Sequence, residues 1–150
     1  MIKRQECLDR IRGVESEYLA ASVAVALLEQ RLRADPSFGK NPRWGNRDVI
    51  NLRDNLEATY LIRMCAEFES ALRDIWLHCY EQTTQPTLRD VLLALGARRF
   101  VPPEWMDTAQ LLRQFRNALV HQGDATTEAI SFVEARNYLC RFVSCMPEDW

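Results

Sequence analysis

Four polar residues in the segment Leu111–Gly123 have side chains suited to cleaving a phosphodiester bond. At about 100° per residue, Arg113, Asn117 and His121 lie along one helical face at positions i, i+4 and i+8, and Arg116 flanks that face. An imidazole exchanges protons near neutral pH, and a guanidinium offers paired donors to phosphate oxygens. The spacing therefore predicts a phosphate-directed site that uses no metal ion and no cofactor.

The separation of Arg116 and His121 bears on the number of subunits in that site. A straight helix points two residues five apart about 140° from one another and separates them by about 7.5 Å along its axis. One such pair makes a poor site alone, whereas a two-fold axis supplies a second pair. We therefore predict a homodimer whose interface includes this helix.

Apolar periodicity predicts the helices that must position these residues. Apolar residues recur every three or four positions from Ile11 to Leu32, which predicts a long helix over about 3–33. Four Pro and Gly residues then indicate a loop over 35–46, whose aromatic residues we expect to pack down. A second long helix is expected from Asn46 or Asp48 to about residue 82.

Capping signals predict three further helices. Thr87 opens a short helix over 88–95, which Gly96 closes in the left-handed conformation. Proline is tolerated in a first helical turn, so the next helix spans about 104–122. An S-x-x-E capping box opens a last helix, which Pro147 ends. These elements predict an all-α, up-and-down bundle of four main helices and one short helix.

The composition is that of one ordinary domain. The 150 residues are 47% hydrophobic and 27% charged, and a net charge of -2 provides no general attraction to a polyanion, so any nucleic-acid binding must be local. No apolar stretch approaches the roughly 20 residues that span a bilayer, and no secretory signal is visible, which predicts no membrane association. Five cysteines without a CxxC pair are typical of reduced thiols in the cytoplasm.

The late helix carries the residues on which a family resemblance rests. Arg116-Asn117-x-x-x-His121 resembles the R-N-x-x-x-H form of the HEPN motif, near the end of a late helix of an α-bundle. Weaker resemblance extends over 56–76, over 134–142 and over 146–150, so that it covers most of the chain as a single HEPN-like domain over 1–150.

The HEPN resemblance implies a function and a role for each motif residue. Many members are dimers that cleave single-stranded RNA without metal, as toxins or in antiviral defence, and a cognate antitoxin or a neighbouring defence protein is a possible partner. Arg116 would stabilise phosphate charge, Asn117 would hold the motif geometry or bind substrate, and His121 would act as acid or base. A subset of HEPN toxins has a tyrosine two residues after the His, which a partner nucleotidyltransferase modifies. This chain has Gly123 at that position, so the resemblance does not imply control by such a modification.

Alternatives to this interpretation remain open in the sequence. In HEPN dimers the Arg and His of both subunits face a shared groove, and a non-catalytic HEPN module would bind nucleotide, RNA or a protein partner through that groove. Arg113, Glu67 and Arg63 are candidate substrate-binding residues, with Glu67 positioned to orient Arg116 or line the groove. Ion pairs on the helix surface are the competing interpretation for Arg63, Glu67, Glu69 and Arg73. The chain contains no P-loop, no G-x-G-x-x-G and no G-x-S-x-G elbow.

Overall fold

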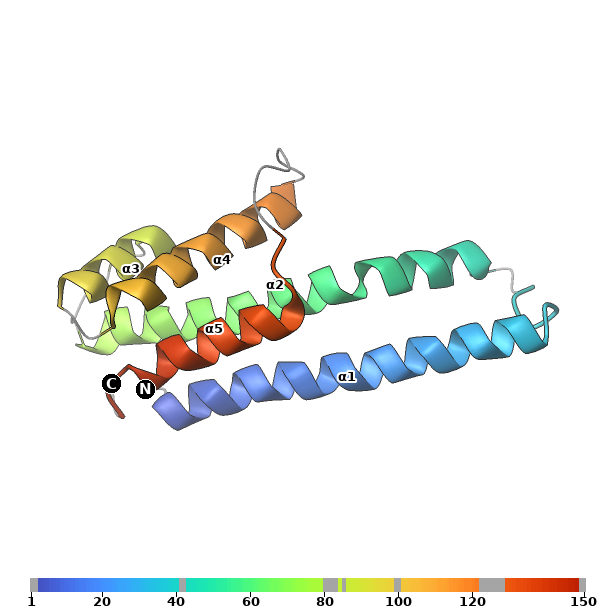
Figure 1. Cartoon of the computed structure of the whole chain (residues 1–150), viewed down its shortest axis with the longest axis horizontal. Coiled ribbons are helices and arrows are strands. Elements are labelled where there is room, and N and C mark those ends of the chain that lie inside the picture. The colour runs from blue at the N-terminus through green and yellow to red at the C-terminus, as the bar shows by residue number, and fades with distance from the viewer. Residues whose placement is uncertain are drawn as a thin grey trace.

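A computed structural model shows an all-helical chain with five helices in the part that it describes (Figure 1). The helices are α1 (Arg4–Ala34), α2 (Asn46–Cys79), α3 (Leu88–Ala97), α4 (Pro103–His121) and α5 (Phe132–Ser144). The described residues are 3–40, 43–79, 84, 86–98, 101–121 and 129–148, without the side chains of Cys79 and His121. The predicted bundle of four main helices and one short helix is confirmed. Within these ranges, no helix is long and apolar enough to cross a membrane.

Helices α1 and α2 form a long antiparallel hairpin, against which the other helices pack at one end (Figure 1). Helix α5 contacts α1, α2 and α4, while α3 packs between α2 and α4. In the connection between α1 and α2, Phe38 and Trp44 make an edge-on ring contact at 6.0 Å, but Phe38 is 42% exposed and does not pack down as expected. The far end of the chain returns to α1, where Arg4 donates to the carbonyl oxygen of Met146 at 3.0 Å.

One hydrophobic core joins all five helices. Each helix contributes at least one side chain that is no more than 2% exposed, including Ile11, Met64, Leu92, Leu112 and Phe142. Burial of a side chain of this size contributes roughly 1.5–3 kcal/mol relative to leaving it in water. The core therefore fixes α4, which carries the predicted motif, against its neighbours.

The predicted end of α3 at Gly96 is wrong. The helix continues through Gly96 to Ala97, and its C-cap residue, Arg98, has a right-handed backbone conformation. A Cβ atom on Gly96 would come within 3.3 Å of Cε of Met106. This glycine therefore allows α3 and α4 to approach closely, which is a packing role that the sequence pattern does not distinguish from a helix stop.

The predicted helix starts at Thr87 and Ser131 are confirmed, each has a capping box, and α5 has an additional cap from another helix. The Thr87 and Ser131 side chains each accept from the backbone three residues on, and Asp90 and Glu134 each accept in return. In addition, the backbone N–H of Phe132 donates to Oε1 of Glu57 in α2 at 2.7 Å. A carboxylate beside the positive end of the α5 dipole ties α5 to α2.

We expect Glu57→Ala to lower the free energy of unfolding by about 1–2 kcal/mol, as the loss of an N-terminal cap does. Glu57→Gln keeps an oxygen acceptor at the same place and should lose less than half as much. Urea denaturation followed by circular dichroism measures both changes. An alanine variant as stable as the wild type would show that this contact contributes nothing to the fold.

Candidate functional site

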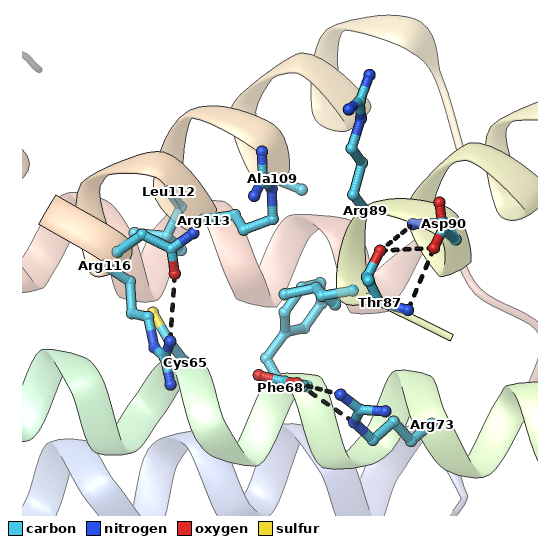
Figure 2. Close-up of a pocket in the computed structure, with 13 residues that line it drawn as sticks. Cys65, Phe68, Arg73, Thr87, Arg89, Asp90, Ala109, Leu112, Arg113 and Arg116 are labelled. Atoms are coloured by element: carbon cyan, nitrogen blue, oxygen red, sulfur yellow. Dashed lines mark hydrogen bonds and ion pairs between the residues drawn. The ribbon is translucent and has the colours of Figure 1, made fainter. Parts of the chain in front are cut away.

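Helix α4 places three of the predicted site residues in one cavity. Arg113, Arg116 and Asn117 line a cavity of about 610 Å³ between α2, α3 and α4 (Figure 2). All three side chains are half-buried, whereas Leu112 and Ala109 on the inner side of α4 are buried in the core. The other lining residues are Cys65, Phe68, Glu69, Arg73, Thr87, Leu88, Arg89, Asp90, Ala109 and Leu112.

Arg116 is oriented by its neighbour in the motif. Its Nη1 donates to Oδ1 of Asn117 at 3.2 Å, and its guanidinium points across the cavity toward Cys65 of α2 (Figure 2). Nε of Arg113 donates to Oε1 of Gln110 at 2.9 Å. No carboxylate in the described part of the chain forms an ion pair with either arginine, so most of their N–H donors are available to an anion.

The cavity carries net positive charge although the whole chain is slightly acidic. Four arginines line it against two carboxylates. Glu69 neutralises Arg73, with Oε1 and Nη2 2.6 Å apart, and Asp90 is engaged in the cap of α3. Asp90 keeps its negative charge, but Arg89, Arg113 and Arg116 outnumber it, so the cavity still attracts a negatively charged ligand.

His121 is the last residue of α4, and its side chain lies outside the described residues. Its backbone continues the helix that carries Arg116 and Asn117. The predicted approach of the imidazole to the same phosphate as Arg116 therefore remains a prediction.

Arg63 and Glu67 lie away from this cavity. Arg63 donates to both carboxylate oxygens of Glu17 in α1. Oε2 of Glu67 lies 3.9 Å from Nη1 of Arg10, which is also in α1. Both residues therefore face α1, and the structure does not bring them together with Arg116. Glu69 lies two residues beyond Glu67, and this separation rotates it by about 200° around the helix and into the cavity.

Sequence reasoning missed Arg89 as a cavity residue and considered Arg73 only as one half of a surface pair. The pair is real, since Arg73 and Glu69 are ion-paired at i, i+4. Arg89 lies in a different helix from the motif, so no spacing in the sequence relates the two. Its presence at the site depends on how α3 packs against α2 and α4.

Cys65 lines the cavity beside Arg116 but is a poor nucleophile. Burial raises the pKa of the Cys65 thiol from 9.0 to about 12, and the positive charge of Arg116 offsets only part of this shift. Because the thiolate is the reactive form, a thiol with this pKa is almost entirely unreactive at neutral pH. Cys65 therefore serves packing rather than chemistry.

The raised pKa predicts a loss of stability in alkali. The thiol of the unfolded chain ionises above about pH 9, whereas the folded thiol stays neutral until about pH 12, so stability is lost as pH rises through this window. At about pH 10 the loss from Cys65 should be about 1.4 kcal/mol. Urea denaturation near pH 8 and near pH 10 measures how much free energy of unfolding is lost between the two pH values. This loss should be smaller by that amount in Cys65→Ala than in the wild type. Equal losses in the two proteins would contradict the shifted pKa.

No family model, curated protein or solved structure matches this chain. The resemblance to HEPN proteins thus rests on the motif and its position in the helical bundle. Among the described residues, no group of three or more His, Cys, Asp or Glu side chains could hold a metal ion.

Proposed function

We propose that this protein is a metal-independent endoribonuclease of HEPN type, which cuts single-stranded RNA at a composite Arg and His site between two copies of the chain. The supporting observation is that Arg113, Arg116 and Asn117 line one cavity whose charge is net positive. A chain with net charge -2 gains little from general attraction to RNA, so a local site of this kind is what RNA binding requires.

The chemistry follows from the groups available. An imidazole of His121 accepts the proton of the RNA 2′-hydroxyl, whose oxygen then attacks the adjacent phosphorus. The bond from phosphorus to the 5′-oxygen breaks, and the departing oxygen takes up a proton. The products are a 2′,3′-cyclic phosphate and a 5′-hydroxyl. Two copies of His121 in a dimer would provide for both proton transfers.

Arg116 stabilises the charge that builds up on the phosphorane oxygens. Arg116 offers a planar fork of N–H donors that matches two phosphate oxygens, and Asn117 holds that fork in place through its 3.2 Å hydrogen bond. Arg113 lines the same cavity and adds to its positive charge, but it is not required to contact the phosphorane. Preorganised donors of this kind are commonly the largest contribution to catalysis.

The same HEPN resemblance suggests the biological setting. A cytoplasmic ribonuclease of this type would act as a toxin or in antiviral defence, and a cognate antitoxin or a neighbouring defence protein would restrain or trigger it. A purified protein, free of contaminating nuclease, that binds RNA or nucleotide but never cuts would instead support the non-catalytic binding module.

We expect the protein to sediment as a homodimer at tens of micromolar, with α4 in the interface. Val120 is 43% exposed on α4, next to His121, so Val120→Glu should shift the protein toward monomer and lower cleavage. Val133→Glu is a matched control, because Val133 is 60% exposed on α5. A wild type that stays monomeric, also with RNA added, would count against the composite site, and identical sedimentation of the two variants would exclude this part of α4 from the interface.

A further inference from the structure

Two arginines on the rim of the cavity are not needed to hold the phosphate that is cut. Arg113 and Arg89 extend from α4 and α3 along the same side of the cavity, away from α2, whereas Arg116 points toward α2 (Figure 2). Arg89 is exposed, and neither rim arginine is ion-paired within the described residues. Two unpaired guanidiniums at the mouth of a cavity repel each other unless an anion lies between them.

Arg89 lies in the first turn of α3, beside Asp90. Thr87, Leu88, Arg89 and Asp90 form the start of α3, and the N-terminus of a helix carries the positive end of its dipole. The Oδ2 atom of Asp90 accepts from both the N–H and the hydroxyl of Thr87, so Asp90 forms no ion pair with Arg89, although its negative charge offsets the helix dipole there. Below the rim, the half-buried Leu88 provides an apolar surface, whereas Leu112 is only 2% exposed.

We infer that Arg89 and Arg113 bind a second phosphate of the RNA strand, next to the phosphate that Arg116 and Asn117 hold. This inference rests on the proposed function for the position of the cleaved bond. Along the α4 axis, Arg113 and Arg116 are about 4.5 Å apart, and His121 lies about 7.5 Å further on, at the end of the helix. The strand therefore passes from the end of α4 toward α3, and the cavity holds the nucleotides on one side of the cleaved bond.

This arrangement explains why the substrate must be single-stranded. Side chains at the rim reach two successive phosphates only if the strand bends into the cavity, where an unstacked base meets the apolar surface of Leu88. A regular duplex keeps its bases stacked and presents its phosphates outside such a cavity. The second phosphate thus sets the register of the strand relative to His121.

Binding of a short single-stranded 2′-O-methyl oligoribonucleotide tests this inference, because the blocked hydroxyl prevents cleavage. Arg89→Gln should weaken binding about tenfold at low salt and reduce the slope of log K against log salt by about 0.7, as expected for the loss of one phosphate contact on a single strand. Arg89→Lys should recover most of the slope. Arg47→Gln removes the same charge from an exposed arginine at the far end of α2 and should change neither quantity. Circular dichroism confirms that each variant is folded.

A double-variant cycle tests whether the two arginines share one phosphate. If they do, Arg89→Gln should weaken binding much less in an Arg113→Gln background than in the wild type. Independent effects of the two substitutions, equal losses in Arg89→Gln and Arg47→Gln, or no binding by the wild type at low salt would each overturn the inference. A protein that shows the expected binding pattern but cuts no RNA would keep the second phosphate site and refute the proposed nuclease.

Discussion

Replacement of His121 by alanine should lower the rate of RNA cleavage by about 10²–10⁴-fold, the usual contribution of a positioned proton-transfer group. The reason is that His121 is the one group in the predicted motif that exchanges protons near neutral pH. The fold should survive, because His121 is the last residue of α4 and the hydrophobic core of the bundle is built from other residues. Initial rates on a defined single-stranded RNA measure the effect.

The other histidine of the chain provides the control for this experiment. His78 is exposed near the end of α2, outside the cavity, so His78→Ala should cleave at the wild-type rate. Both variants should keep the circular dichroism and the sedimentation of the wild type. Full activity in a folded His121→Ala dimer would remove His121 from the mechanism.

Arg116→Lys should reduce cleavage by about 10²–10³-fold, the range observed when a donor to a developing oxyanion is removed. Lysine keeps the positive charge but loses the planar pair of donors, and it cannot reproduce the guanidinium geometry that the 3.2 Å contact with Asn117 holds. The reduction should appear in kcat more than in KM, since the charge is greatest in the transition state.

Arg53→Lys is the matched control for Arg116→Lys. Arg53 is exposed on α2 and pairs with Glu29 and Asp54, away from the cavity, so its replacement should leave the cleavage rate unchanged. If Arg116→Lys cut RNA as fast as Arg53→Lys did, charge alone would suffice and bidentate contact with phosphate would be ruled out.

The helices could be predicted from the sequence because their signals are local. The apolar spacing over 11–32 and the capping residues Thr87 and Ser131 act within a few positions of the helices that they specify. The shared face of Arg113 and Asn117 follows from helical geometry in the same way, and the structure places both in one cavity. Local rules therefore predicted the elements and the part of the site that one helix provides.

The remaining features depend on how the helices pack against one another. The spacing of residues within one helix carries no information about this packing. The sequence pattern predicts a helix stop at Gly96, but the lack of a side chain there serves the contact with Met106 in α4. Glu67 was a candidate for the groove, whereas Glu69, on the other side of the same helix, lines it. Arg89 joined the site only through the position of α3. Each of these outcomes was decided by a neighbouring helix.

The most direct test of the proposed function compares a defined single-stranded RNA with the same strand carrying one 2′-deoxy nucleotide at the cut site, with end-group analysis of the products. The expected result is that the wild-type dimer cuts only the all-ribose strand, with or without excess EDTA, and leaves a 2′,3′-cyclic phosphate and a 5′-hydroxyl. The imidazole and guanidinium groups of His121 and Arg116 would supply the proton transfer and charge stabilisation for this reaction. Cleavage of the deoxy strand at the same bond, or loss of activity in EDTA, would contradict the mechanism, and a verified dimer that cuts no RNA would contradict the proposed function.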